Sequence, residues 1–187
     1  MIIGLVGRNA SGKTTVADYL KAKGFYYYSL SDVLRDEAQR LGVFPTRDNL
    51  IKIGNELRKK FGAGILSTLT LEKMKGDRNY IVDSIRNPEE ARLLKMHGAH
   101  LFFIDADIQK RFERLRERGR EGDPKTFDEF LRVEQKEESG TSETDQQLDA
   151  TVKLADLRIS NDSTVEDLQK RVDTALGSLS SNFERPD

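Results

Sequence analysis

The sequence contains no cysteine and only two histidines among its 187 residues. The lack of cysteine excludes a disulfide framework, a cysteine-based zinc site and a thiol nucleophile, and His97 and His100 alone are too few to build a metal site. Apolar runs are also short. None approaches the length of about 18 residues that a membrane-spanning helix needs, and the opening run lacks the basic flank of a signal peptide. We therefore expect a cytoplasmic protein without a membrane partner.

Charged residues are abundant, but neither sign prevails. The 31 lysines and arginines nearly balance the 32 aspartates and glutamates, which leaves a formal net charge of -1. This balance disfavours nucleic acid as a partner and leaves the oligomeric state open. The chain length predicts a single domain, which we place at residues 1–177. We expect residues 178–187 to form a disordered tail.

Short apolar segments alternate along the chain with segments of helical periodicity. The apolar segments predict strands at residues 2–6, 25–29, 80–83, 101–104 and 157–160. Strands that alternate with helices are typical of a parallel sheet covered on both faces. We therefore predict an α/β fold of the P-loop NTPase type, a three-layer sandwich with a five-stranded parallel sheet. Two helical regions extend beyond this plan, at about residues 31–75 and at the highly charged residues 111–140.

A phosphate-binding motif lies between the first predicted strand and the helix that follows it. Gly7-Arg8-Asn9-Ala10-Ser11-Gly12-Lys13-Thr14 matches the Walker A pattern G-x-x-x-x-G-K-[ST]. The two glycines let the backbone N–H groups converge on phosphate oxygens at the positive end of the helix. Lys13 would neutralise the β- and γ-phosphates, and the Thr14 hydroxyl would bind Mg²⁺. We predict that ATP is contacted by Gly7, Arg8, Asn9, Ala10, Ser11, Gly12, Lys13, Thr14 and Thr15, although Thr15 has the alternative role of simply starting the helix.

Asp83 closes the third predicted strand. A carboxylate at this place can hold Mg²⁺ through water, as a Walker B residue does. The alternative is that Asp83 caps a turn or a helix. We predict Thr14 and Asp83 as the metal-binding residues.

Arginines and one aspartate around the second and third predicted strands suggest a second anion site. In a doubly wound sheet the carboxyl ends of the strands share one crevice, so Arg35 and Arg86 are expected near the γ-phosphate. Arg47 and Arg58 either contact an acceptor or are solvated charges on helix faces. Asp32 could orient the acceptor, cap a helix, or act as general base if the acceptor is a hydroxyl.

The charged region 111–140 predicts a helical lid. Arg111, Arg114 and Arg118 are spaced to share one helix face, which could close on a triphosphate. We expect Arg114, Arg118 and Arg120 to contact ATP, with Arg118 stabilising the transferred charge. The glutamates between these arginines suit an ordinary salt-bridged surface helix equally well.

Taken together, these motifs resemble the nucleoside monophosphate kinase family over about residues 2–176. Asp32-Val33-Leu34-Arg35 is similar to the adenylate kinase segment whose arginine grips the acceptor phosphate. Asp83-Ser84-Ile85-Arg86 is similar to the D-G-x-P-R turn of that family, with Ser and Ile in place of Gly and Pro. The predicted lid resembles the family's lid but lacks its paired aspartate.

Two further segments are more similar to dephospho-coenzyme A kinase. They are residues 7–20 and Ile159-Ser160-Asn161-Asp162. In that family the late asparagine lies near the adenine, which implies a nucleotide contact for Asn161. Over its whole length the chain looks most like archaeal adenylate-kinase-related proteins of unassigned substrate. The resemblance implies ATP and a nucleotide-like acceptor, whose identity it leaves open.

Two functions follow from these patterns. The first is a Mg²⁺-dependent ATP:nucleotide phosphotransferase, in which Lys13, Asp32, Arg86 and Arg118 carry the catalytic roles. Its acceptor would be a nucleoside or deoxynucleoside monophosphate, or a dephospho-coenzyme A-like molecule. The alternative is an ATPase switch or assembly factor that acts on a macromolecular partner. A basic tail would favour that alternative, and residues 178–187 are not basic.

Overall fold

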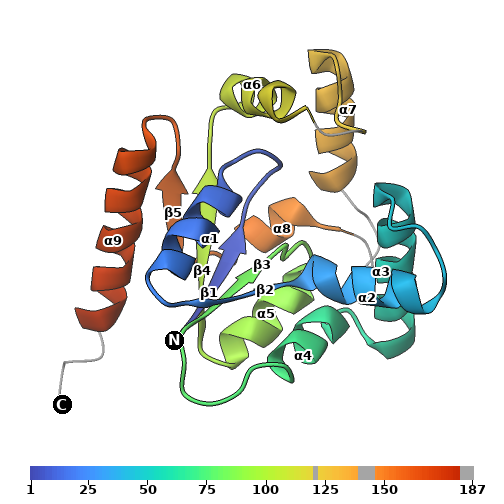
Figure 1. The fold of residues 1–187 in the computed structure, drawn as a ribbon, viewed down its shortest axis with the longest axis horizontal. Coiled ribbons are helices and arrows are strands. Elements are labelled where there is room, and N and C mark those ends of the chain that lie inside the picture. Colours follow the sequence, from blue (N-terminus) through green and yellow to red (C-terminus); the bar gives the residue numbers. More distant parts are fainter. Residues whose placement is uncertain (120–121, 139–145, 182–187) are drawn as a thin grey trace.

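A parallel sheet with helices on both faces forms the centre of the molecule (Figure 1). The computed structural model describes residues 1–119, 122–138 and 146–181. All strand pairs are parallel, in the order β2-β3-β1-β4-β5. The predicted fold class is therefore confirmed. The strands are β1 Ile2–Val6, β2 Tyr26–Ser29, β3 Tyr80–Asp83, β4 Ala99–Asp105 and β5 Leu157–Ser160.

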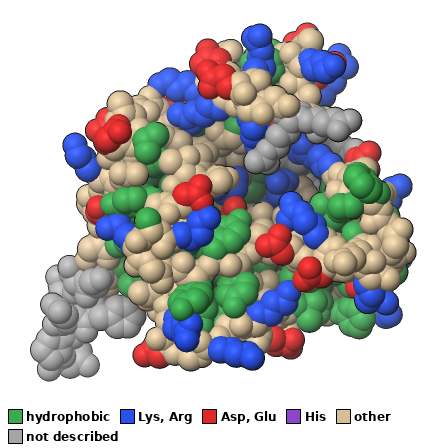
Figure 2. Space-filling view, in the orientation of Figure 1, with side chains coloured by type: hydrophobic (Ala, Val, Ile, Leu, Met, Phe, Trp, Pro, Cys, Tyr) green, Lys and Arg blue, Asp and Glu red, His purple; other side chains and the backbone are tan. Residues whose placement is uncertain are grey.

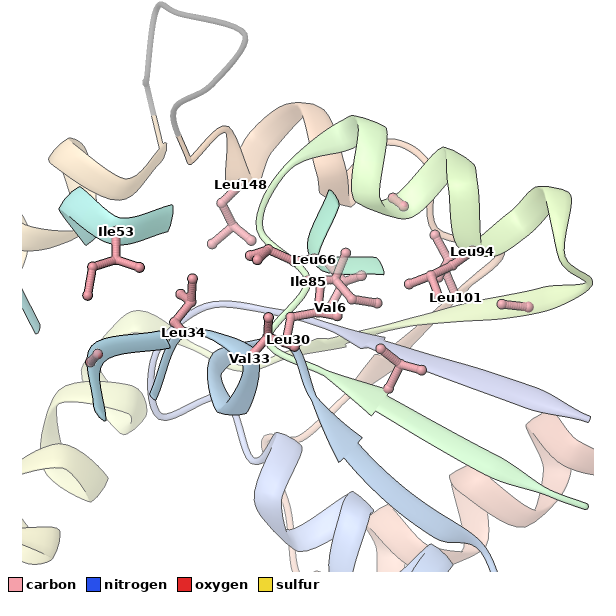
Figure 3. Close-up of a cluster of buried hydrophobic side chains, with 14 residues drawn as sticks. Val6, Leu30, Val33, Leu34, Ile53, Leu66, Ile85, Leu94, Leu101 and Leu148 are labelled. Atoms are coloured by element: carbon pink, nitrogen blue, oxygen red, sulfur yellow. The ribbon is translucent and has the colours of Figure 1, made fainter. Parts of the chain in front are cut away.

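The core divides into two clusters, one on each face of the sheet, because successive side chains of a strand point in opposite directions. Ile3 and Leu5 of β1 pack with α1 (Lys13–Ala22) and α9 (Val165–Ser181). Val6, at the end of the same strand, belongs to the second cluster, which Figure 3 shows between the sheet and the helices of the opposite layer. This alternation produces the three layers.

On the face of the sheet opposite α1 and α9, the second cluster is covered by helices. Their bounds are α2 Leu30–Arg40, α3 Arg47–Phe61, α4 Ile65–Leu71, α5 Pro88–Met96 and α8 Leu148–Val152. Within the predicted helical region at residues 31–75, Gly62 ends α3 with φ 96° and so separates it from α4. The sequence patterns did not predict α8, which is short and is anchored by the buried Leu148.

The predicted lid contains two helices, α6 (Ile108–Arg118) and α7 (Phe127–Glu138). Three phenylalanine rings hold them together: the ring centroids of Phe112 and Phe127 lie 5.3 Å apart, and those of Phe112 and Phe130 lie 5.6 Å apart. The two helices therefore pack as one unit. Residues 139–145 of the predicted lid lie outside the described residues.

The prediction of a disordered tail from residue 178 is wrong for residues 178–181. Helix α9 continues to Ser181 because Leu179 extends its apolar face and joins the same cluster as Leu168 and Val172. Residues 182–187 of the predicted tail lie outside the described part of the chain. Among the helices that the structure describes, none is both long enough and apolar enough to cross a membrane.

Candidate nucleotide and acceptor site

The loop between β1 and α1 depends on two glycines. A Cβ atom on Gly7 would lie 2.4 Å from the carbonyl oxygen of Ile104, and one on Gly12 would lie 2.0 Å from Asn161 Nδ2. Gly12 also has φ 102°, a conformation that residues with a side chain rarely adopt. It occupies the N-cap of α1 and offers no side chain to the first-turn N–H groups. These groups are therefore available to a phosphate at the positive helix end.

Lys13 Nζ folds back over this loop. It donates hydrogen bonds to the carbonyl oxygens of Gly7, at 2.7 Å, and Arg8, at 3.0 Å. Burial lowers the pKa of the Lys13 ammonium to about 8; the Asp83 carboxylate opposes this shift and the Arg86 guanidinium adds to it. The partners in direct contact are neutral carbonyls, so a phosphate oxygen would compensate the ammonium charge far better.

Asp83 ends β3, which pairs directly with β1. One carboxylate oxygen accepts the main-chain N–H of Ser84 at 2.5 Å, and the other accepts the Tyr27 hydroxyl at 3.2 Å. Burial, followed by the Asp83 charge, raises the pKa of Tyr27 above its ordinary value, so Tyr27 stays a donor. Asp83 is thus held near Lys13 by a tyrosine that sequence reasoning missed.

A hydroxyl and a carboxylate are the oxygen ligands that Mg²⁺ prefers. Thr14, on the exposed first turn of α1, and Asp83 therefore fit such an ion. Within residues 1–119, 122–138 and 146–181, no group of three His, Asp or Glu side chains could hold a metal ion without help. A Mg²⁺ ion at this place would need phosphate oxygens and water to complete its shell.

The lid and the β5–α9 loop touch the phosphate-binding loop. Asn161 Nδ2 donates to the carbonyl oxygen of Ser11 at 2.8 Å, and Arg114 Nη2 donates to the carbonyl oxygen of Asn161 at 2.7 Å. Arg111 Nη1 reaches the carbonyl oxygen of Asn9 at 3.4 Å. Of the predicted ATP contacts, Asn161 therefore lies against the loop and supports its backbone, whereas Arg114 bonds to Asn161.

Two lid arginines, Arg111 and Arg118, have carboxylate partners. The buried Arg111 pairs with the buried Glu134 of α7, an acid that the sequence patterns did not single out. Arg118 forms a forked contact with Asp123, at 3.1 Å from Nε to Oδ2 and 2.8 Å from Nη2 to Oδ1. Arg120, the remaining predicted ATP contact in the lid, lies outside the described residues.

Arg86, on the turn between β3 and α5, faces the same centre as Lys13. Burial lowers the pKa of its guanidinium, the Arg47 charge adds to this effect, and the Asp83 charge opposes it. Its Nη1 donates to Gln146 Oε1 at 3.1 Å, and its carbonyl oxygen accepts the main-chain N–H of Gln147 at 2.8 Å. Because the Arg86 guanidinium is buried and has a second positive charge nearby, an anionic partner would stabilise its charged form.

Arg58 is not a solvated charge on a helix face, which was one of the two alternatives for this residue. Its side chain is 4% exposed, and its Nε and Nη2 donate to Glu90 Oε1 at 2.9 and 2.7 Å. Glu90 is fully buried and also closes the capping box at the start of α5. Arg58 therefore supports the turn that carries Arg86.

Asp32 and Arg35 lie on the exposed side of α2. Their side chains pair at 2.7 Å and are more than half exposed. The Asp32 charge nevertheless contributes to the raised pKa of Tyr27, which bonds to Asp83, so Asp32 stands near the end of β3 that carries Asp83.

Arg47 begins α3 and stands across from the lid. Burial of part of its guanidinium lowers its pKa, although the residue as a whole is exposed, and the carboxylates of Asp123 and Glu134 oppose the shift. Arg47 thus links the acceptor side electrostatically to α7 and to the loop before it. Figure 2 shows a hollow on this face with Lys and Arg side chains around it.

Comparisons with known proteins show the family of this chain. Residues 3–141 match the family model described as an AAA domain. The UPF0200 protein PH1008 of Pyrococcus horikoshii is 32% identical over 192 positions, which cover 98% of this chain and 100% of the relative. A UPF0200 protein of Hyperthermus butylicus is 30% identical and covers 96% of this chain and 95% of its own.

Solved structures extend the likeness to kinases. A shikimate kinase from Bacteroides thetaiotaomicron has a TM-score of 0.61 at 14% identity, covering 95% of this chain and 98% of its own. The protein TT1252 from Thermus thermophilus has a TM-score of 0.59 at 20% identity, covering 96% and 97%. At such identities the likeness shows a shared P-loop kinase fold and leaves the substrate to the site itself.

Proposed function

We propose, from the premise that this chain belongs to the UPF0200 proteins and to the family of the AAA domain model, that it is a Mg²⁺-dependent phosphotransferase. It would transfer the γ-phosphoryl group of ATP to a small nucleotide acceptor, either a nucleoside or deoxynucleoside monophosphate or a dephospho-coenzyme A-like molecule. The adenylate-kinase-like relation predicted from the sequence motifs is part of this proposal.

The placement of three charged residues carries the proposal. Lys13 follows β1, Asp83 ends the neighbouring strand β3, and Arg86 lies on the turn after β3. The pKa of Lys13, on the phosphate-binding loop, is lowered by burial, raised by the Asp83 charge and lowered by the Arg86 charge. A cation for the donor phosphates, a carboxylate for Mg²⁺ and a cation for the acceptor therefore act on one another in a single site. Phosphoryl transfer depends mainly on such positioning and charge neutralisation.

In this mechanism the loop amides and Lys13 hold the β- and γ-phosphates, and Arg86 holds the acceptor in line with the γ-phosphorus. The acceptor oxygen forms a bond to that phosphorus while the bond to the β-phosphate bridging oxygen breaks, and ADP leaves. Thr14 and Asp83 would hold Mg²⁺, which supplies charge neutralisation at the β- and γ-oxygens. Arg114 and Arg118 of the lid, with Arg120 beside them in the sequence, would approach the developing charge as the lid closes.

The acceptor atom decides the role of Asp32. A phosphate oxygen attacks without help from a strong base, whereas a sugar hydroxyl needs one, and Asp32 is the base that we propose for it. For a hydroxyl acceptor, Asp32→Asn should abolish turnover and spare ATP binding. A variant that keeps full turnover would remove the base role and leave Asp32 as a partner of Arg35.

The experiment is an ADP-release assay with ATP and Mg²⁺ against ribo- and deoxynucleoside monophosphates and dephospho-coenzyme A. We expect one acceptor to accelerate ADP formation well above background, with equimolar phosphorylated product, and Lys13→Ala to abolish it. Slow release of free phosphate that no acceptor accelerates, and that Lys13→Ala abolishes, would contradict the proposal and favour the ATPase switch.

A further inference from the structure

Glu90 makes four hydrogen bonds with a carboxylate that is completely buried. Oε1 accepts Nε and Nη2 of Arg58, at 2.9 and 2.7 Å. Oε2 accepts the main-chain N–H groups of Arg86 and Asn87, each at 3.1 Å. One carboxylate oxygen therefore binds a side chain of α3, and the other binds the main chain of the turn from which the Arg86 side chain extends.

The same residue joins three helices. Arg58 comes from α3, Glu90 lies in the first turn of α5, and Ser67 of α4 donates its hydroxyl to the Glu90 carbonyl oxygen at 3.0 Å. Helix α3 also begins with Arg47, whose charge acts on Arg86. The contact therefore connects the helix that presents one acceptor-side arginine to the turn that presents the other.

The charges explain why the arrangement suits an anion. The Glu90 carboxylate raises the pKa of Arg86 and the Arg58 guanidinium lowers it, so the two partners oppose each other at that guanidinium. Arg58 and Glu90 together are neutral, which leaves the positive charge of Arg86 uncompensated by them. A single buried carboxylate thus fixes the Arg86 backbone without neutralising the Arg86 side chain.

We infer that Glu90 and Arg58 are positioning residues of the acceptor anion site, and that the carboxylate of Glu90 sets the turn that aims Arg86 at the acceptor. The inference rests on the proposed function only in taking Arg86 as an anion ligand. A merely structural ion pair would affect stability, and buried ion pairs are often replaceable by apolar residues without loss of stability. A positioning pair would affect anion binding even where stability is restored.

The experiment compares Glu90→Gln, Arg58→Met, Arg58→Lys and the apolar double variant Arg58→Met/Glu90→Leu. Inorganic phosphate is titrated into protein saturated with a non-hydrolysable ATP analogue and Mg²⁺, so that the phosphate-binding loop is occupied and the second anion site is measured. The Kd of the analogue and the Tm are recorded for every variant. The matched control is Arg92→Met/Glu89→Gln, an exposed ion pair on the same helix α5.

We expect the single variants Glu90→Gln and Arg58→Met to lose Tm and to bind phosphate at least about tenfold more weakly, as loss of a charged hydrogen bond does. Arg58→Lys should fall between these variants and the wild type, because one ammonium replaces a fork of two donors. The double variant should regain the part of the Tm that the unpaired charge costs, but not the part lost when the main-chain N–H groups of Arg86 and Asn87 lose their acceptor. It should not regain the phosphate affinity. The analogue should bind all variants within about twofold of wild type, and the control should match wild type throughout.

The inference is overturned if phosphate affinity returns with Tm in the double variant, or if analogue and phosphate affinities fall together. It is also overturned if the wild-type protein saturated with analogue does not bind phosphate, or if Arg86→Met does not weaken that binding. These readouts need no turnover. An absence of any accepted substrate in the ADP-release assay would therefore remove the proposed function and leave this result standing on its own.

Discussion

The proposed donor side and the proposed acceptor side of the site are built by different means. On the donor side, consecutive residues of one loop present backbone groups to a ligand, and close packing against Ile104 and Asn161 maintains the loop. On the acceptor side, the groups are side chains from α2, α3 and the turn before α5. Ion pairs hold two of them: Arg35 pairs with Asp32 on the same helix, and Arg58 pairs with Glu90, which lies 32 positions away.

This difference predicts which substitutions should affect each side of the site. A site made of backbone groups should be sensitive to substitution of its glycines and of Lys13, whose ammonium would neutralise the phosphates. It should tolerate most other substitutions. A side-chain site responds to the loss of single contacts, because each arginine is oriented by a separate partner. Changes on the acceptor side should therefore alter substrate affinity without altering ATP affinity, and this separation can be tested.

The largest expected effect belongs to Lys13→Ala. We expect kcat to fall by about 10²–10³-fold or more, since a charge that acts in the transition state is lost. Stability should not fall, because burial disfavours the ammonium, as its lowered pKa of about 8 shows. The measurement is kcat from ADP release together with Tm. A variant with normal kcat would mean that the loop binds a ligand other than a reacting triphosphate.

Gly12→Ala tests the packing of the donor loop, with Gly24→Ala as a matched control. Both glycines have positive φ, 102° and 90°, but a Cβ atom at Gly24 would meet nothing within 4 Å, whereas one at Gly12 would meet Asn161 Nδ2 at 2.0 Å. We expect Gly24→Ala to lower the free energy of unfolding by about 1–2 kcal/mol, the cost of the left-handed conformation. Gly12→Ala should lose more and should also weaken ATP binding, since Asn161 must move.

Urea denaturation and ATP titration measure this pair of variants. Equal destabilisation of both would show that conformation alone decides the cost and that Asn161 yields easily. Retained ATP affinity in Gly12→Ala would show that the loop tolerates displacement of Asn161.

The same contrast explains what the sequence could and could not predict. The strands were predictable because β1 and β4 are buried apolar runs, and the phosphate-binding loop was predictable because its residues are contiguous. The bond from Arg58 to Glu90 spans 32 positions and has no periodicity to mark it. The spacing of Asn87 and Glu90 is that of a capping box and is typical of a helix start, but such spacing does not show that the same carboxylate also binds α3.

The remaining departures have similar causes. Helix α8 was missed because it is short and only Leu148 and Thr151 among its residues are buried. The extension of α9 was missed because the sequence after Gly177 is rich in serine, while Leu179 continues the buried face. The roles of Asp32, Arg35 and Arg47 in substrate binding stay predictions, since the structure shows their neighbours and not an acceptor.

Arg86→Lys tests the acceptor side. A lysine keeps the charge but loses the planar fork of donors, so the acceptor KM, or the Kd for phosphate, should rise by about 10–100-fold. The Kd for an ATP analogue should stay within about twofold. Arg92→Lys on the exposed face of α5 is the control and should change neither value. A parallel loss of ATP and acceptor affinity would mean that the two sides are not separate.

The smallest expected effect is the pH dependence of the donor side between pH 8 and 9. Burial lowers the pKa of Lys13 from 10.5 to about 8. Only the ammonium form neutralises phosphate, so above pH 8 binding must take up a proton and ATP affinity should fall by up to about tenfold per pH unit. Below pH 8 this group should contribute no change. Acceptor-side affinity should not show this dependence, because Arg86 stays charged throughout.

The free energy of unfolding of the unliganded protein should move in the opposite direction over the same range. Between pH 8 and 10.5 the unfolded chain holds a proton on Lys13 that the folded protein has lost. Stability from this group therefore rises with pH across that window. The difference between wild type and Lys13→Met, measured by urea denaturation and by ATP titration from pH 7 to 10, isolates both effects. If affinity and stability keep a constant offset from the variant across pH 8 to 10, Lys13 is not buried as an uncompensated cation.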